Sequence, residues 1–330
     1  MHTLRNRFFG AACLTFAALA APATFAQAWP TKSLKWIVPF PPGGPTDLLS
    51  RAIAQGLSES LGQPVVIENR GGAGGGLAMD ALAKSAPDSY TIGLPTTGTH
   101  AINPALYGSK LPYDPVRDFT PLTLAISYVN ILVINPQHPA KNVAELVAYA
   151  KANPGKVTFG SAGNGSSNHL SGEVLKMVTG TSMQHIPYKG SAQALTDVMA
   201  GNTTFMYDIL NTSLPQARAG RVRAIAVTSS KRSPYAPEVP TMEEAGVKGY
   251  SAAGSDLWMG VMGPQGIPKP IADRLSAELI KVLRSPAMRE KIRAQFLDPW
   301  TCTPEEFTKI IKDDIAKWGK IVRDSGARVD

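Results

Sequence analysis

The sequence predicts an α/β protein of two lobes, with two mixed, mainly parallel sheets, flanking helices and a hinge of two crossing segments. Short apolar runs rich in β-branched residues alternate with segments of helical periodicity, which is typical of parallel strands joined by crossover helices. About 300 residues follow an N-terminal export signal, which is enough for two domains with separate cores. The apolar run at 120–136 is too long for one ordinary strand.

The N-terminal segment, residues 1–28, has the order of features of a secretory signal peptide. Arg5 and Arg7 precede an apolar stretch at 8–21, and small-residue cleavage patterns follow at 24–26 and 26–28. The apolar stretch is shorter than the ~20 residues that span a bilayer, so we expect cleavage and export. Only Cys302 then remains, so no intramolecular disulfide is expected.

The charge distribution argues against nucleic-acid binding. The chain has 33 Lys and Arg against 25 Asp and Glu, and its net charge of +8 falls to +6 without the two signal arginines. Basic residues are mixed with acids, as at 309–317, and form no stripe. We therefore expect a mildly basic surface and no nucleic-acid partner.

The predicted strands and helices alternate along the chain. Apolar positions repeat every three or four residues at 49–61 and 170–178, as on one face of a helix. Asn142 with Glu145, and Thr303 with Glu306, predict helix N-termini with a reciprocal acid at the third position. The last helix carries apolar residues over 307–322. The predicted strands lie at 34–38, 65–67, 90–94, 131–134, 157–159, 184–186, 204–207, 223–227 and 257–262.

Two segments are predicted to cross between the lobes. The first is the middle of the long apolar run, at 127–130, and the second is 250–256. Residues 29–128 with 252–330 then form one lobe, and residues 129–251 form the other. Ligands of open α/β sheets bind outside the carboxyl ends of the strands, so the loops after the strands are the candidate site.

The loop after the first strand, 39–47, leads directly into a helix. Its residues Pro42, Gly43, Gly44, Thr46 and Asp47 combine uncovered backbone amides with the positive end of the helix dipole. Such an end binds carboxylate or phosphate groups. The alternative is a turn without a ligand, in which Asp47 complements the dipole.

Two further loops and one acid complete the candidate site. Hydroxyls, amides and bare glycines fill 161–169 at another helix entrance, although these residues could serve only as caps. Asp208 ends the strand at 204–207 and is expected to point toward the cleft, with surface exposure as the alternative. The candidate residues are Ser161, Gly163, Gly165, Ser166, Ser167 and His169 in one loop, and Thr96, Thr97 and His100 in the other.

Enzyme signatures are absent from the sequence. The nucleophile pattern Gly-x-Ser-x-Gly does not occur, and the glycines at 71–76 fail the dinucleotide pattern at its last position, so they indicate a tight helix entry. The five histidines show no close pairing with cysteine or acid that would hold a metal. No cofactor and no catalytic residue are therefore expected.

The ordered motifs of the chain resemble those of one receptor family. They are WPTK at 29–32, IVPFPPGG at 37–44 with Asp47, VIENR at 66–70, APDSYT at 86–91, YDP at 113–115 with DF at 118–119, ANPGK at 152–156, GSAG at 160–163, HL at 169–170, PYKG at 187–190 and PEVPT at 237–241 with Glu244 and Gly246. Together they cover the mature chain. The sequence is similar to the solute receptors of tripartite tricarboxylate transporters, the Bug family.

The resemblance implies a type II-like periplasmic binding protein that captures a carboxylate and delivers it to an inner-membrane permease of two subunits. It also implies a monomeric receptor in the periplasm, and it assigns the three loops above to the ligand carboxylate, with Asp208 near the cleft. Two turn positions depart from the family pattern. Ser89 stands where glycine is usual, and Gly71 stands where proline is common.

The ligand and one aspect of the role stay open at this stage. Aliphatic di- or tricarboxylates and aromatic acids are both compatible with the loops, and an aromatic wall is possible. Its candidate residues are Phe40, Tyr128, Tyr188, Tyr207 and Trp258. Presentation of a ligand to a membrane sensor kinase is the alternative function, and a serine hydrolase using Ser166 or Ser167 with His169 is a remote one.

Overall fold

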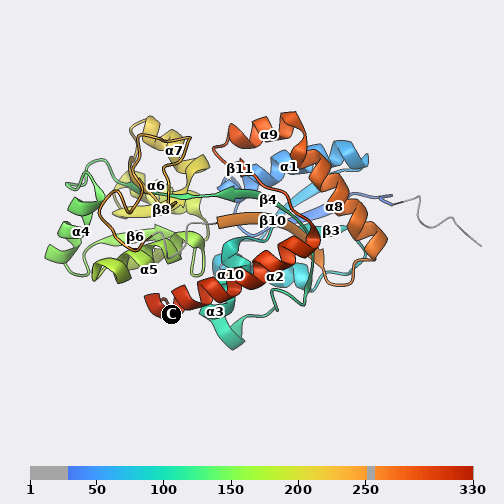
Figure 1. Cartoon of the computed structure of the whole chain (residues 1–330), viewed down its shortest axis with the longest axis horizontal. Coiled ribbons are helices and arrows are strands. Elements are labelled where there is room, and N and C mark those ends of the chain that lie inside the picture. The colour runs from blue at the N-terminus through green and yellow to red at the C-terminus, as the bar shows by residue number, and fades with distance from the viewer. Residues whose placement is uncertain (1–28, 251–256, 330) are drawn as a thin grey trace, which may run out of the picture.

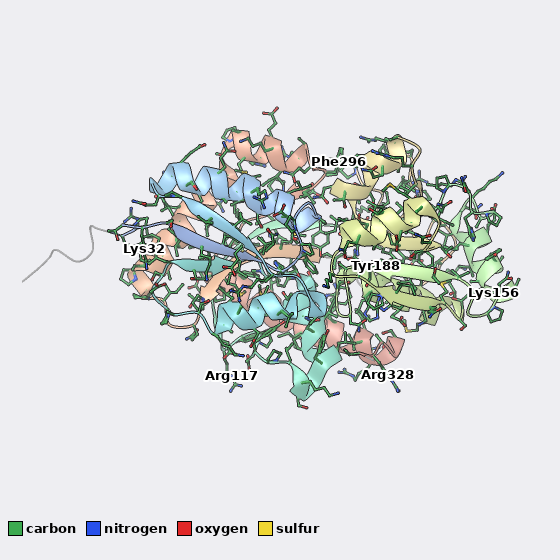
Figure 2. The ribbon with its side chains drawn as sticks, turned by 180° about the vertical axis from the view of Figure 1, so that it is seen from behind. Lys32, Arg117, Lys156, Tyr188, Phe296 and Arg328 are labelled. Carbon is green, nitrogen blue, oxygen red and sulfur yellow. The ribbon has the colours of Figure 1, made fainter. Side chains whose placement is uncertain are left out.

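The computed structural model describes residues 29–250 and 257–329, which form two α/β lobes side by side (Figure 1). Each lobe has one mixed sheet with helices packed on it, so the predicted fold class is confirmed. Lys32 and Lys156 mark the far ends of the two lobes (Figure 2). We call the lobe with the six-stranded sheet lobe 1 and the lobe with the five-stranded sheet lobe 2.

The sheet of lobe 1 has the strand order β11-β4-β10-β3-β1-β2. Strands β1, β2 and β3 are parallel, whereas β10 runs antiparallel to both β3 and β4, and β11 pairs antiparallel with β4. The strands are β1 (Leu34–Val38), β2 (Val65–Asn69), β3 (Thr91–Gly93), β4 (Phe119–Tyr128), β10 (Leu257–Pro264) and β11 (Asp298–Pro299).

The sheet of lobe 2 has the order β7-β6-β8-β5-β9. Strands β6, β7 and β8 are parallel, and β5 runs antiparallel to β8 and β9. The carboxyl ends of the parallel strands therefore lie at one edge, where the candidate loops begin. The strands are β5 (Asn130–Ile134), β6 (Thr158–Ser161), β7 (Gln184–Pro187), β8 (Phe205–Ile209) and β9 (Arg223–Val227).

Several helices begin where the sequence signals predicted them, whereas the helix that follows the predicted loop at 161–169 already begins at Ser167. In α1, Leu49, Ile53 and Leu57 are fully buried, and the helix ends at Gly62 in the left-handed region, with φ of 69°. The caps at Asn142 and Thr303 are confirmed. Lobe 1 carries α1 (Pro45–Leu61), α2 (Gly76–Ala83), α3 (Asn103–Tyr107), α8 (Lys269–Arg284), α9 (Pro286–Arg293) and α10 (Pro304–Ser325); lobe 2 carries α4 (Val143–Ala152), α5 (Ser167–Thr179), α6 (Ser191–Ala200) and α7 (Leu210–Arg218).

The described part of lobe 1 also has three short helical turns, one in the glycine cluster, one in the loop after β3 and one after α3. They are η1 (Ala73–Gly75), η2 (Gly98–Ile102) and η3 (Gly108–Lys110). Because η1 leads directly into α2 at Gly76, the interpretation of this glycine cluster as a tight helix entry is confirmed.

The first crossing between the lobes takes a single residue. Strand β4 ends at Tyr128 in one sheet and β5 begins at Asn130 in the other, so the chain passes between sheets at Val129. The return crossing predicted at 250–256 lies, apart from Tyr250, outside the described residues. The lobe boundaries therefore stay a prediction.

A long C-terminal helix also contacts both lobes. Helix α10 packs on β4 and α3 of lobe 1, and its C-terminal part lies along α5 of lobe 2 (Figure 1). The largest cluster of buried apolar side chains likewise includes residues of both lobes, such as Trp36 and Phe159. None of the helices in the described part of the chain is long and apolar enough to span a membrane.

Candidate functional site

A cavity of about 130 Å³ lies between the lobes, at the carboxyl ends of their strands. Lobe 1 contributes the loop after β1 together with Thr96, Tyr128 and Met259, and lobe 2 contributes the loops after β6 and β7 together with Ile209 at the end of β8. The lining residues are Phe40, Pro41, Pro42, Gly44, Pro45, Thr46, Thr96, Tyr128, Ala162, Ser166, Ser167, Asn168, Gly190, Ser191, Ala192, Gln193, Ile209 and Met259.

The N-terminus of α1 forms the lobe 1 end of the cavity. Gly43 has φ of 81°, a conformation that favours glycine, and it aims the chain into the helix at Gly44. No side chain caps this helix, and Pro45 fixes its first turn. Thr46 is 2 % exposed and its hydroxyl has no hydrogen-bond partner in the protein. A buried hydroxyl without a partner marks a place where a ligand or water can bind.

The N-terminus of α5 faces the same cavity from lobe 2. Ser166 caps the helix: its hydroxyl accepts from the His169 amide at 3.2 Å and donates to the Gly163 carbonyl at 2.8 Å. The hydroxyls of Ser167 and Tyr128 lie 3.3 Å apart. Asn168 is 4 % exposed, and its Nδ2 has no partner. This end therefore offers hydroxyl and amide donors to a ligand.

Helix α6 adds a third N-terminus. Its N-cap is Gly190, which has no capping side chain, and Ser191, Ala192 and Gln193 of the first turn line the cavity. Ile209, the N-cap of α7, lies in the lining as well. Since each helix end carries a partial positive charge, their convergence makes the cavity attractive to anions.

The cavity has positive helix ends around it but no ionised side chain among the described residues that line it. Within the described ranges 29–250 and 257–329, the lining holds no Lys, Arg, His, Asp or Glu. In the same ranges, no group of three or more His, Cys, Asp or Glu could hold a metal ion. Helix dipoles, amides and hydroxyls are thus the groups that would meet a bound anion.

The lobes approach each other closely around the cavity, and a backbone group takes part in each contact. A Cβ placed on Gly74 would lie 2.1 Å from the carbonyl oxygen of Asn164, and one on Gly165 would lie 1.9 Å from Oδ1 of Asn103. The Tyr107 hydroxyl also donates to the Asn164 carbonyl at 3.2 Å. These contacts join lobe 1 to lobe 2, so the structure has the lobes closed on the cavity.

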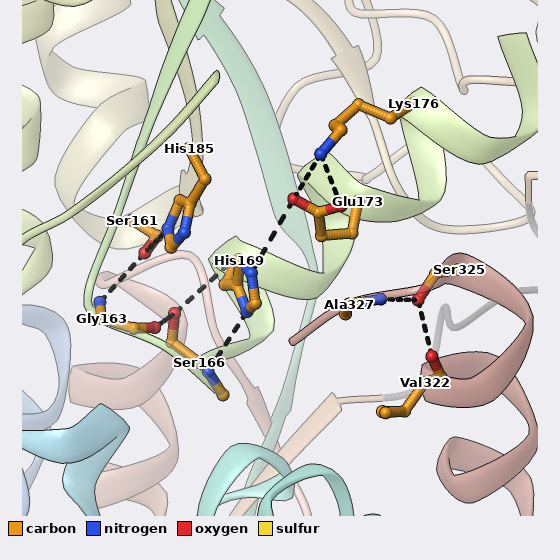
Figure 3. A network of polar contacts seen from close by, with 11 residues as sticks. Ser161, Gly163, Ser166, His169, Glu173, Lys176, His185, Val322, Ser325 and Ala327 are labelled. Carbon is orange, nitrogen blue, oxygen red and sulfur yellow. Dashed lines mark hydrogen bonds and ion pairs between the residues drawn. The ribbon is translucent and has the colours of Figure 1, made fainter. Parts of the chain in front are cut away.

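A polar network behind the cavity holds the loop after β6 in shape (Figure 3). The Ser161 hydroxyl lies 2.6 Å from Nε2 of His185 and accepts from the Gly163 amide. The Gly165 amide donates to Nδ1 of His169, whose ring stacks on His185 with centroids 4.1 Å apart. Burial lowers the pKa of His169 to about 3, so this ring is neutral and its Nδ1 can accept.

Asp47 stabilises the loop after β1 through hydrogen bonds and does not line the cavity. Its carboxylate accepts from the Gly43 amide, Arg51 Nε and Asn69 Nδ2, each at 3.0 Å. Burial acts to raise the pKa of Asp47, but the hydrogen bonds, with that from Arg51 first, outweigh burial and place the pKa below its usual value. The acid is therefore ionised and is neutralised by its own loop.

Most of the predicted residues in the loop after β3 support the cavity wall and do not line it. Thr96 lines the cavity, whereas the Thr97 hydroxyl accepts from the Trp258 amide at 2.8 Å. His100 is fully buried against Phe119, with ring centroids 4.8 Å apart, and its Nδ1 bonds to the Thr99 hydroxyl. Burial lowers the pKa of His100 to about 3.

Asp208 lies inside β8 and does not line the cavity. The strand continues to Ile209, so the expectation that Asp208 ends its strand is wrong. Its side chain is fully buried and accepts from the hydroxyls of Thr212 at 2.6 Å and Ser213 at 2.7 Å. Burial raises its pKa in spite of these hydrogen bonds. Asp208 thus fixes the start of α7.

The structure divides the predicted site residues into two groups. The cavity is lined by Pro42, Gly44, Thr46, Thr96, Ser166 and Ser167. The remaining nine lie behind or beside the lining: Gly43, Asp47, Thr97, His100, Ser161, Gly163, Gly165, His169 and Asp208. Of the possible aromatic wall, only Phe40 and Tyr128 are in the lining.

Sequence reasoning missed several lining residues, above all Asn168 and the first turn of α6. A signal for α6 was present. Gly190 and Ser191 follow β7 after two residues and open a helix, which is the pattern that identified the other loops. Asn168 lay within the predicted loop, but its side chain could not be told from a cap.

Comparison with known proteins places these features in one family. The model of the "Tripartite tricarboxylate transporter family receptor" matches residues 49–327. The chain is similar to Protein BugT of Bordetella pertussis, with 38 % identity over 95 % of each chain.

Two solved structures with ligands are similar over almost their whole length. R. palustris Rpa4515 with adipate is 37 % identical at a TM-score of 0.86, covering 91 % of this chain and 100 % of that one. MatC (Rpa3494) from Rhodopseudomonas palustris with bound malate is 31 % identical at a TM-score of 0.84, covering 89 % of this chain and 100 % of that one.

Proposed function

Because this chain belongs to the tripartite tricarboxylate transporter family of receptors, we propose that it captures a small carboxylate in the interlobe cavity and delivers it to a membrane permease of two subunits. The family consists of periplasmic solute-binding receptors and not of enzymes. The family membership is shown, whereas the identity of the ligand, its contacts in the cavity and its delivery to a permease are what we propose.

The observation that carries the proposal is the convergence of helix N-termini on an uncharged cavity. The ends of α1, α5 and α6 meet there, and Thr46 Oγ1 and Asn168 Nδ2 are buried without protein partners. A carboxylate accepts hydrogen bonds only, and it is stabilised by such positive ends. A cationic or purely apolar ligand would leave these donors unpaired.

The arrangement favours an aliphatic dicarboxylate. Donors lie on both lobes, at Thr46 on one side and at Ser167 and Asn168 on the other, with apolar groups of Phe40 and Met259 also in the wall. Two carboxylates joined by a short apolar chain fit this pattern, and relatives hold adipate and malate. A tricarboxylate or an aromatic acid is the second candidate class, the aromatic one favoured by Phe40 and Tyr128.

The proposed contacts follow from the lining. We assign the ligand contacts to Pro42, Gly44, Thr46, Thr96, Ser166, Ser167, Asn168, Ser191, Ala192 and Gln193, and the support of the loops to Gly43, Asp47, Thr97, His100, Ser161, Gly163, Gly165, His169 and Asp208. The N-terminal residues 1–28 are proposed as a signal peptide that is removed on export, and the mature receptor as a monomer.

A thermal-unfolding screen tests the ligand. Purified mature protein is heated with adipate, malate, citrate, glutamate, nicotinate and phthalate at millimolar concentration. A ligand that binds only the folded state adds about 2.7 kcal/mol at 100 times its Kd, so one acid class should raise Tm by several degrees. Amines of similar size serve as controls and should give no shift. If no acid shifts Tm, the carboxylate proposal is wrong.

Delivery requires a separate test in cells. Deleting the gene should abolish uptake of the radiolabelled acid that gives the thermal shift. If uptake is unchanged and only induction of gene expression is lost, the alternative role in presenting the ligand to a membrane sensor kinase is supported instead.

A further inference from the structure

Phe296 occupies a backbone position that normally calls for glycine. The residue follows α9, where its amide donates to the Arg293 carbonyl and the Leu297 amide donates to the Ile292 carbonyl. These two bonds are those of a helix end with a left-handed residue, most often glycine. Phe296 has φ of 58°. A bulky residue in this region is strained, so its side chain must gain something in return.

The ring of Phe296 belongs to the core of the other lobe. It packs on an apolar cluster of lobe 2 whose other members all lie between residues 129 and 239. The next residue, Leu297, is instead buried in the largest apolar cluster, which includes residues of both lobes. Figure 2 shows Phe296 where the two lobes meet. The side chain of Phe296 thus links the end of α9 in lobe 1 to the apolar core of lobe 2.

Two residues of lobe 2 hold this ring. Tyr235 meets it edge to face with centroids 5.9 Å apart, and the Arg218 guanidinium lies over it at 5.2 Å. Arg218 also donates to the Tyr235 carbonyl at 2.6 Å. Aromatic and cation–π contacts of this kind are directional, so they depend on the relative placement of the lobes.

Hydrogen bonds of Tyr235 extend the junction to the strand beside the crossing. Its hydroxyl donates to the Leu297 carbonyl at 3.0 Å and to Oδ1 of Asp298 at 2.9 Å. Asp298 pairs with Ser127 of β4, two residues before the crossing at Val129. Burial and Asp298 raise the pKa of Tyr235 to about 12, so the hydroxyl keeps its proton.

We propose that Phe296, Tyr235 and Arg218 form a positioning cluster that stabilises the closed arrangement of the lobes and thereby raises ligand affinity without touching the ligand. The lobes are closed in this structure and the cluster is fully assembled across them. Packed interfaces switch between discrete arrangements, so rotation of one lobe about Val129 would disturb these contacts. A ligand that binds the closed state gains apparent affinity as that state becomes more populated. The inference rests on the proposed function.

The central experiment replaces Phe296 by glycine. Phe296→Gly removes the interlobe ring and relieves the left-handed backbone, and these two effects offset each other in part, so the ligand-free Tm should be unchanged or a few degrees lower. The Kd for adipate or malate, whichever stabilises the wild type, should rise roughly five- to ten-fold. Small-angle scattering without ligand should give a larger radius of gyration than the wild type.

Ser89→Gly is the matched control. Ser89 has φ of 69° and is buried in lobe 1, next to Asp88, which pairs with Lys32 at the far end of that lobe (Figure 2). This change relieves the same backbone conformation, and it should leave both Kd and radius of gyration at their wild-type values. A merely structural role of Phe296 would make the two variants behave alike.

Tyr235→Phe gives a second, milder test. It keeps the ring and removes the two hydrogen bonds, so its effect on Kd should be smaller, and combination with Phe296→Gly should be less than additive. If Phe296→Gly and Tyr235→Phe both retain the wild-type Kd and radius of gyration, the inference is overturned. If the wild type binds no carboxylate, the proposed function fails, while scattering of the ligand-free variants still decides the inference.

Discussion

The two faces of the cavity are built from different chemistry. Lobe 1 presents Pro41, Pro42 and Pro45 with Phe40 and one helix end, whereas lobe 2 presents a run of small polar residues at the ends of α5 and α6. Proline has no amide hydrogen and a fixed φ, so the lobe 1 face is rigid and poor in donors. If the cavity binds an anion as proposed, most of the attraction should therefore come from lobe 2, and lobe 1 should mainly cover the ligand and exclude water.

The largest expected effect comes from placing a charge on the donor-rich face. Ser167→Asp puts a carboxylate in the first turn of α5, where the helix dipole stabilises it. Tm without ligand should stay equal or rise. A carboxylate ligand would then meet a like charge in a desolvated site, so its affinity should fall by about 100-fold or more.

Isothermal titration with the neutral variant Ser167→Asn provides the comparison for this charge. The asparagine variant has nearly the same size as the aspartate and should bind within a few-fold of the wild type. Equal binding by both variants would contradict the assignment of the anion site to the end of α5.

The second largest effect is expected from a variant that prevents the two lobes from closing on the cavity. Gly74→Ala puts a methyl group 2.1 Å from the Asn164 carbonyl oxygen, so the lobes cannot close fully and ligand affinity should fall about 20-fold. Gly62→Ala is the control, because Gly62 also has positive φ but nothing within 4 Å of the added Cβ. A similar loss of affinity in both variants would assign the effect to backbone strain.

A smaller effect is expected on the donor-poor face. Thr46→Val removes a buried hydroxyl that has no protein partner, so the ligand-free protein should be as stable as the wild type or more stable. Affinity should fall about five-fold through the loss of one hydrogen bond. Asn168→Leu on the opposite face should weaken binding more. Titration calorimetry giving the reverse order would refute the contrast between the faces.

The smallest effect concerns pH, where the lobes should behave alike. His100 in lobe 1 and His169 in lobe 2 both have pKa values of about 3, against 6.5 when unperturbed. Between these values the unfolded chain binds more protons, so stability rises with pH and is lost as pH falls below about 6.5. From pH 7 to pH 6, each histidine should cost about 0.7 kcal/mol.

Urea unfolding at the two pH values measures this cost. His169→Asn should reduce the loss by the share of one histidine, since asparagine can still accept from the Gly165 amide. An unchanged pH dependence in this variant would mean that the buried ring takes up a proton in the folded protein.

Much of the fold could be predicted because its signals are local. Apolar runs, caps such as Asn142 and Thr303, and the overlong run that is divided at Val129 each depend on neighbours in sequence. The site could be predicted only in part, because the loops were identifiable but the directions of their side chains were not. Asp47 and His169 look like ligand groups in the sequence, yet their partners are Asn69 and the Gly165 amide.

The residues that sequence reasoning missed depend on distant contacts. Nothing near Gly74 in sequence reveals that it meets Asn164 of the other lobe, and nothing near Phe296 reveals Tyr235. The glycines at 71–76 were correctly interpreted as a helix entry, but their second role as the closing surface exists only once both lobes are folded.

The absence of ionised side chains from the cavity lining, among the residues that the structure describes, also bears on how such receptors diversify. Partial charges of helix ends belong to the backbone and persist whatever side chains stand nearby. Substitutions at Phe40, Ala162 or Met259 can therefore alter the size and shape accepted while the attraction for an acid is retained. Selection for a new nutrient acid can then act through neutral replacements, with no need to rebuild an ion pair at each step.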